Sequence, residues 1–238
     1  MNLSLCVLTV PSREEQARRL AEELGASLHI DHYGSPTKAH ANAWYEALAD
    51  ARCKSAHYTE DWVGVIEDDA ILADGATRDD LMHMLRKAPA DIVSGYLGRA
   101  KPADTQPHIE QALKHDPHYV ITYRLLHHVA VFMRAKHVAK AAAYLREHPK
   151  FPCDEALGIW AQTAGEPVAY SVPSQFDHMD SEPVILGRPV TTGDPAEPRI
   201  AWVLGDRDDW DGKRIQLLDQ PTRNRYGRRY GQRPAQPA

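Results

Sequence analysis

Apolar runs of strand length alternate along this chain with amphipathic segments of helical period. Residues 3–10, LSLCVLTV, predict a buried strand. The next segment predicts a helix, with Ser12 as its cap, Glu15 three residues later as in a capping box, and Gly25 as its stop. Regular alternation of strands and helices is typical of an α/β fold, so we expect a mostly parallel central sheet flanked by helices.

The remaining expected elements continue this alternation to about residue 173. We expect further strands at 27–34, 62–66, 90–98 and 166–173, two strands within 119–135, and helices at 35–55, 76–89, 136–149 and 153–165. Residues 99–118 show no clear period, which predicts a loop that is flexible or faces the substrate. From Asp180 onward Pro and Gly become frequent and the periodicity fades.

Charge is distributed unevenly along the chain. From Gly212 to the end there are seven basic residues and one acid, a net charge of +6; since the whole chain carries −5, residues 1–211 carry −11. The segment PTRNRYGRRYGQRPAQPA predicts a tail rather than a packed element. We therefore expect two parts, a catalytic-type α/β domain over residues 1–211 and a basic, flexible tail over residues 212–238.

The general composition is that of a soluble globular chain, 43% hydrophobic and 26% charged. No apolar stretch approaches the roughly 18 residues of a membrane-spanning helix, and the N-terminus turns polar after Pro11 without a basic leader, which argues against a signal peptide. Cys6, Cys53 and Cys153 are far apart and odd in number, a pattern that favours reduced thiols over a disulfide framework or a zinc site. We expect a cytoplasmic protein with no membrane partner.

The segment DWVGVIEDDAIL carries three consecutive acids, Glu67, Asp68 and Asp69, directly after an apolar strand. In open α/β sheets, ligands bind beyond the carboxyl ends of the strands. Like charges packed there repel one another unless a cation neutralises them, and Mg²⁺ or Mn²⁺ is the simplest such cation. The alternative is that the acids only cap a surface turn.

Three further features favour a binding site. Lys38 and His40 lie near the start of the expected helix 35–55, where a phosphate would be stabilised. Asp154 and Glu155 lie at the start of the helix 153–165, where a carboxylate could act as a base. His178 is expected in a loop directly after a strand, where a neutral imidazole could complete a metal shell.

Each of these residues also has a purely structural interpretation. His40 could only satisfy a local hydrogen bond, which we favour over catalysis, and Lys38 could simply be solvated. Asp154 and Glu155 could only cap their helix. Four more residues are expected to be structural: His127 and His128 in a strand, and Trp44 and Trp160 in the core.

The chain resembles the GT-A class of nucleotide-sugar glycosyltransferases in four features taken together. These are the motifs KAHANAW and VIEDDA, the helix at 153–165 with its two acids, and the segment PSQFDH. Within that class the chain most resembles the lipooligosaccharide and procollagen galactosyltransferase type, which carries an LSHxxxW helix followed by a strand ending in LEDD. The resemblance covers roughly residues 3–185. The chain departs from it at Ala39, where the family has serine, and in a C-terminal loop without the usual HxG.

The resemblance implies a hexosyltransferase that uses Mn²⁺ or Mg²⁺ and a nucleotide sugar, with a UDP-sugar such as UDP-glucose expected. Asp69 would bind the metal, and His178, far along the chain, would be a second metal ligand. Glu67 or Asp68 would hold the donor's ribose, or the metal through water. The bound metal would neutralise the diphosphate leaving group.

The same resemblance places the remaining contacts. The residues bordering the nucleotide would be Pro11, Ser12 and Arg13, directly after the first strand. Asp154 or Glu155 would deprotonate the acceptor hydroxyl if transfer inverts the anomeric centre.

The tail interleaves arginines with Tyr226 and Tyr230, a composition that can neutralise phosphates and stack on bases. The alternative is a disordered basic terminus without a partner. A cytoplasmic transferase without an anchor needs a soluble acceptor. We slightly favour a hydroxylated pyrimidine in DNA, the acceptor that phage-type glucosyltransferases modify in a host cytoplasm. A base in a duplex would have to be flipped out. Saccharide and protein acceptors remain open.

Two other functions compete with the transferase. A non-catalytic module could use the acidic site and the basic tail to hold a nucleotide or nucleic acid. A metal-dependent nucleotidyltransferase would also need paired acids, but it predicts a Gly-rich phosphate loop after the first strand. The segment TVPSREEQ contains no glycine, so this function ranks last.

Overall fold

The computed structural model describes residues 1–32, 34–99, 102–179 and 199–218. The helices of this part are α1 (Glu14–Leu24), α2 (Pro36–Lys54), α3 (Arg78–Lys87), α4 (Gln106–Leu113), α5 (Ala135–Glu147) and α6 (Cys153–Ala164), with short 3-10 turns at Pro11–Arg13 and Tyr58–Glu60. The strands are β1 (Leu3–Thr9), β2 (Ser27–Ile30), β3 (Trp62–Glu67), β4 (Ala70–Leu72), β5 (Ile92–Ser94), β6 (Tyr119–Thr122), β7 (Ala130–Arg134), β8 (Val168–Ser171), β9 (Phe176–His178) and β10 (Ile215–Leu217).

Eight of these strands form one sheet, in the order β10-β6-β8-β5-β7-β3-β1-β2. Four of its seven neighbouring pairs are parallel, and β7 runs antiparallel to both β3 and β5. The expected α/β fold with a mostly parallel, helix-flanked sheet is confirmed at this level. A second, two-stranded sheet pairs β4 with β9.

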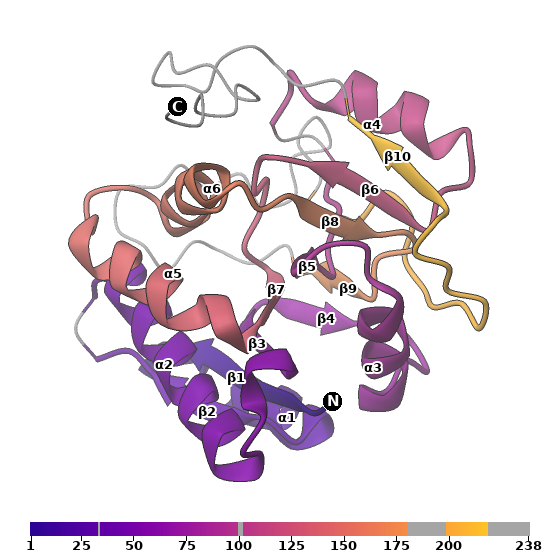
Figure 1. The fold of residues 1–238 in the computed structure, drawn as a ribbon. Helices are drawn as coiled ribbons and strands as arrows, with labels where there is room; N and C mark the ends of the chain where they lie inside the picture. The colour runs from indigo at the N-terminus through magenta and orange to yellow at the C-terminus, as the bar shows by residue number, and fades with distance from the viewer. Residues whose placement is uncertain (33, 100–101, 180–198, 219–238) are drawn as a thin grey trace.

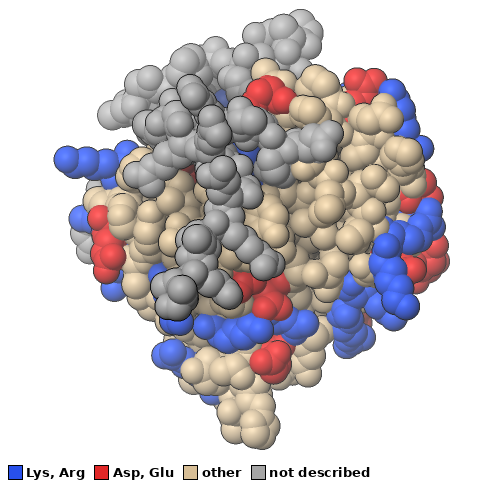
Figure 2. Space-filling view, turned by 45° about the horizontal axis from the view of Figure 1, so that its top comes forward, with Lys and Arg blue, Asp and Glu red and all other residues tan. Residues whose placement is uncertain are grey.

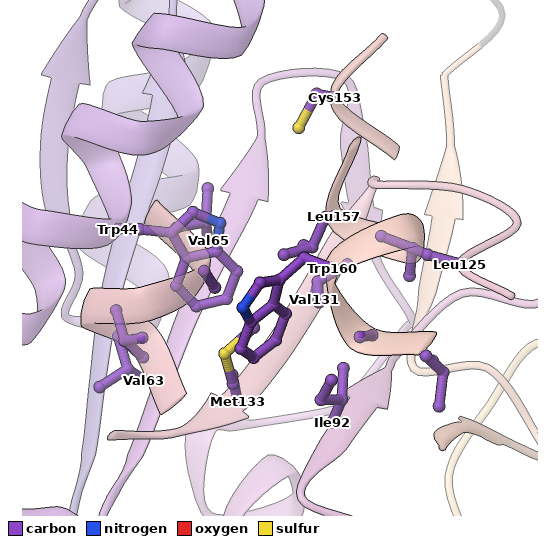
Figure 3. Close-up of a cluster of buried hydrophobic side chains, with 14 of the residues drawn as sticks. Trp44, Val63, Val65, Ile92, Leu125, Val131, Met133, Cys153, Leu157 and Trp160 are labelled. Carbon is purple, nitrogen blue, oxygen red and sulfur yellow. The ribbon is translucent and has the colours of Figure 1, made fainter. Parts of the chain in front are cut away.

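Helices cover both faces of the large sheet (Figure 1). Successive side chains of β1 point to opposite faces of the sheet, and both faces carry apolar residues. Cys6 and Leu8 pack in a buried cluster with α2, α5 and α6, whereas Leu5 and Val7 pack in a second cluster with α1 and α3. Trp44 and Trp160 belong to the first cluster, as Figure 3 shows, so the prediction that they are core residues is confirmed.

The structure corrects four local predictions. Residues 99–118 contain the helix α4, which begins with the sequence Gln-Pro, and Pro is readily accommodated in the first turn of a helix. Ser12 lies in a 3-10 turn and forms no capping box, because α1 begins only at Glu14. His127 and His128 lie in the connection between β6 and β7 rather than in a strand. His178 ends the short strand β9 and is not in a loop.

The described chain remains part of the sheet beyond residue 211, the boundary expected for the first domain. β10 pairs in parallel with β6 at the sheet edge, and Arg214 donates to the carboxylate of Asp116 at 2.6 Å. The remainder of the expected tail, residues 219–238, lies outside the described residues. No helix in the described part of the chain has the length and apolar character needed to cross a bilayer.

Candidate active site at the end of β3

The three acids lie at the carboxyl end of β3, next to the carboxyl end of the parallel strand β1. Glu67 is the last residue of β3, and Asp68 and Asp69 form the turn into β4. The sheet therefore places the acids where ligands of α/β proteins bind. Their side chains point to different partners, so each acid has a separate environment.

Asp68 is held by residues of β1 and of the segment that follows it. Thr9 donates its hydroxyl to Oδ2 of Asp68 at 2.7 Å, and Arg13 donates to Oδ1 at 3.0 Å. Gln16 donates to the backbone carbonyl of Asp68 at 2.7 Å. Burial raises the pKa of Asp68, and the bonds from Thr9 and Arg13 oppose that rise. Asp68 thus anchors Arg13 against the acidic turn.

Asp69 lies beside His178 because β4 and β9 pair directly after the acidic turn. Ala70 is opposite His178 in that pair, and the amide of Met179 donates to the carbonyl of Asp69 at 2.7 Å. Nε2 of His178 lies 3.5 Å from Oδ2 of Asp69. Among the described residues, Oδ1 of Asp69 and Nδ1 of His178 are buried without a hydrogen-bond partner.

Glu67 faces the opposite side of the turn, toward α2. Nε2 of His40 lies 2.9 Å from Oε1 of Glu67, and Nδ1 of His40 lies 2.7 Å from the carbonyl of Pro36. Burial alone would lower the pKa of His40, but Cys153 and Glu67 raise it well above its ordinary value. Nδ1 of His40 therefore donates to Pro36, which is the local hydrogen bond of the structural interpretation, and Nε2 of the same ring faces the carboxylate of Glu67.

Arg13 brings a positive charge to the carboxylates. Its Nη1 is 3.0 Å from Oδ1 of Asp68 and 3.5 Å from Oδ2 of Asp69. Pro11 and Ser12 are exposed in the 3-10 turn that precedes it. Of the three residues expected to border a nucleotide, Arg13 therefore contacts the acidic turn, and Pro11 and Ser12 precede it in the same 3-10 turn.

The other expected site residues approach from α2 and α6. Lys38 is exposed on the first turn of α2, two residues before His40. Asp154 and Glu155 are half-buried in the first turn of α6, where Oδ1 of Asp154 accepts from the amide of Glu155 at 2.8 Å. Cys153 precedes them and contributes to the raised pKa of His40, so the start of α6 lies close to the Glu67 side of the site.

Three contributing residues were not predicted from the sequence as site residues: Thr9, Gln16 and His128. Thr9 is the last residue of β1, which is parallel to β3. A polar residue at that strand end could have indicated from the sequence that Thr9 belongs to the site. His128 becomes a neighbour of Glu67 only through the antiparallel pairing of β7 with β3, in which the amide of Glu67 donates to Val129. No local pattern in the sequence indicates that pairing.

The residues at Asp69 suit a hard divalent ion. Nε2 of His178 and Oδ2 of Asp69 are 3.5 Å apart, and imidazole nitrogens and carboxylate oxygens are both ligand types that Mn²⁺ accepts. The other atom of each group, Nδ1 of His178 and Oδ1 of Asp69, is buried without a hydrogen-bond partner in the described chain. Asp68 is different, because Thr9 and Arg13 already occupy its oxygens. Asp69 and His178 would therefore hold the ion, with Asp68 fixing Arg13 beside it.

Searches of the sequence against known protein families and against characterised proteins give no match.

Proposed function

We propose that this chain is a metal-dependent glycosyltransferase of the GT-A type, which moves a sugar from a nucleotide sugar to a hydroxyl acceptor. The observation that carries the proposal is the position of Asp69. Its carboxylate follows the carboxyl end of β3, lies beside His178, and keeps a buried oxygen without a hydrogen-bond partner among the described residues. A divalent ion at that position would supply Lewis-acid stabilisation of a diphosphate leaving group.

Arg13 supports the same assignment. Asp68 holds its guanidinium within 3.5 Å of the Asp69 carboxylate, and guanidinium groups bind phosphates through two parallel hydrogen bonds. Its role would be to orient the diphosphate of a UDP-sugar and to balance its charge. The half-buried carboxylates of Asp154 and Glu155, at the start of α6, are the candidate bases for the acceptor hydroxyl.

The acceptor proposal keeps the preference for a hydroxylated pyrimidine in DNA, and saccharide and protein acceptors are the alternatives. On the face shown in Figure 2, Lys and Arg side chains lie interspersed with Asp and Glu rather than in a continuous basic patch. The preference comes from the arginines in the sequence of residues 219–238, which lie outside the described residues.

The test is release of the nucleotide from a panel of nucleotide sugars in the presence of Mn²⁺, Mg²⁺ or EDTA. The wild type should act on one donor only with metal, and Asp69→Asn should abolish the release. Asp74→Asn changes an exposed acid on the same segment and serves as the matched control. Hydroxymethylated DNA, oligosaccharides and peptides, added in turn, then identify the acceptor by the acceleration they produce.

A further inference from the structure

A second group of potential metal ligands lies on the other side of Glu67. Ligand atoms of His40, His128 and Cys153 all lie within 4.8 Å of one another. The three residues come from α2, from the β6–β7 connection and from the first turn of α6. Their exposed fractions are 6%, 4% and 8%, so the group is buried. Figure 3 shows Cys153 at the margin of the apolar cluster that contains Trp44 and Trp160.

The burial of the His128 imidazole is not explained by apolar packing or by hydrogen bonds to other described residues. Its two ring nitrogens are buried, and neither has a hydrogen-bond partner in the described part of the chain. Its ring meets that of His40 edge to face at 4.4 Å between centroids, and its Nδ1 is 4.0 Å from Oε1 of Glu67. A buried polar group without a hydrogen-bond partner destabilises a fold, so a ligand bound to His128 would remove this destabilisation.

We propose that His40, His128 and Cys153 bind one Zn²⁺ ion. Glu67 lies beside this group, with Oε1 2.9 Å from Nε2 of His40 and 4.0 Å from Nδ1 of His128, and would turn toward the ion as its fourth ligand. Thiolate and imidazole ligands in a tetrahedral arrangement select zinc over the hard ions that prefer oxygen. Ligand atoms on one tetrahedral zinc ion lie about 3.3 to 3.6 Å apart, from zinc bond lengths of about 2.0 to 2.3 Å. The ligand atoms of His40, His128 and Cys153 are at most 4.8 Å apart, so a contraction of no more than about 1.5 Å would bring them to zinc-binding distances.

The surroundings of His40 already meet the needs of a zinc ligand. Its Nδ1 donates to the carbonyl of Pro36, which leaves Nε2 as the atom that faces Glu67. Zinc-binding histidines typically donate their second nitrogen to a carbonyl in this way. The ion would replace the proton that His40 now shares with Glu67.

The charge of the group also balances. A Cys153 thiolate and a Glu67 carboxylate together carry −2, which one Zn²⁺ cancels, so no net charge is buried. Thr37 fixes the distance between the two helices, since its hydroxyl donates to the carbonyl of Phe151 at 2.7 Å, just before α6. The zinc site would thus lock α2 and α6 onto β3 and hold Glu67 away from Asp69.

This inference does not depend on the proposed function, because zinc binding is measured without any donor. The full-length protein is stripped with chelator, reloaded with Zn²⁺ and analysed for bound metal, then reloaded with Co²⁺ and examined by absorption spectroscopy. The wild type should hold one tightly bound zinc, and its cobalt form should show a sulfur-to-cobalt charge-transfer band. Cys153→Ser should lose the band, and Cys153→Ser and His128→Asn should each weaken zinc binding by more than about 100-fold, beyond the usual effect of outer-shell changes.

Three variants serve as controls. Cys53→Ser and His57→Asn remove an exposed thiol and an exposed imidazole, and both should keep the zinc and the band. Asp69→Asn should keep them as well, which separates this site from the one at His178. A wild type that retains no zinc, or folded Cys153→Ser and His128→Asn variants that bind it as tightly as the wild type, would overturn the proposal. If those variants do not fold, the cobalt spectrum of Cys53→Ser decides, and absence of the band overturns it.

Discussion

Nε2 of His178 lies 3.5 Å from the carboxylate of Asp69, although the two residues are far apart in the sequence. The short β4–β9 pair produces this proximity by placing His178 opposite Ala70. His178→Ala removes a proposed direct ligand and should therefore weaken Mn²⁺ binding by more than about 100-fold, beyond the usual effect of losing an outer-shell partner. Titration with Mn²⁺ followed by paramagnetic resonance measures this. His83→Ala on α3 is the control, and equal Mn²⁺ affinity in the His178 and His83 variants would contradict the assignment.

Asp68 should matter chiefly for stability. Its carboxylate is buried and accepts from Thr9 and Arg13. Asp68→Ala leaves both donors without their acceptor and should lower the free energy of unfolding by about 1.5 to 3 kcal/mol, the range for hydrogen bonds to charged groups. Asp68→Asn retains an acceptor for Thr9 and should cost less. Urea unfolding of both variants measures the difference, and an Asp68→Ala protein as stable as wild type would refute the anchoring role.

Tyr170 should stabilise the β6–β7 connection, residues 123–129, which contains His128. Its hydroxyl donates to the carbonyl of Arg124 at 3.0 Å and accepts from the amide of Leu126 at 2.6 Å. Tyr170→Phe leaves both backbone groups unsatisfied and should lower the free energy of unfolding by about 1 to 3 kcal/mol. Hydrogen exchange should show faster opening of residues 123–129, while an unchanged exchange rate there would exclude this role.

Asp91 should contribute to the acid sensitivity of the fold. Partial burial opposes its ionisation, but Lys136 at 2.7 Å and His137 at 3.1 Å outweigh that effect and lower its pKa. A folded-state pKa below the unfolded one gives stability that is present above the unfolded pKa and is lost as the pH falls through the folded pKa. Asp91→Asn should therefore cost about 0.5 to 1 kcal/mol at pH 7.

The cost of Asp91→Asn should shrink as the solution is acidified below the ordinary pKa of an aspartate. Free energies of unfolding, measured for both proteins from neutral to acid pH, test this. In a Lys136→Met background the substitution should cost less, because the nearest cation is absent. If the difference in free energy of unfolding between wild type and Asp91→Asn stays constant down to acid pH, the ionisation of Asp91 does not contribute to stability.

The order of strands and helices was predictable because each element has a local signature. The 3.6-residue pattern of α2 and the apolar run of β3 both appear where the sequence indicates them. The turn of acids after β3 was predictable for the same reason. By contrast, Ser12 looked like a helix cap but caps no helix, whereas Thr77 and Asp80 form a complete capping box at the start of α3.

The site itself was only partly predictable, since long-range pairings determine it. The register of β7 against β3 brings His128 to Glu67, and the β4–β9 pair brings His178 to Asp69. Likewise, the wide spacing of Cys153 from other cysteines argued against a zinc site, whereas the fold surrounds it with histidines. Sequence spacing carries no information about such contacts between distant segments.

The most direct test of the proposed transferase is nucleotide release from a UDP-sugar panel with and without Mn²⁺, compared between wild type and Asp69→Asn. The account predicts release from one donor that requires the metal, is abolished by EDTA, and falls by at least about 100-fold in the variant, which corresponds to about 2.7 kcal/mol of transition-state stabilisation. Release that continues unchanged in Asp69→Asn, or no release from any nucleotide sugar by a folded, metal-loaded wild type, would contradict it.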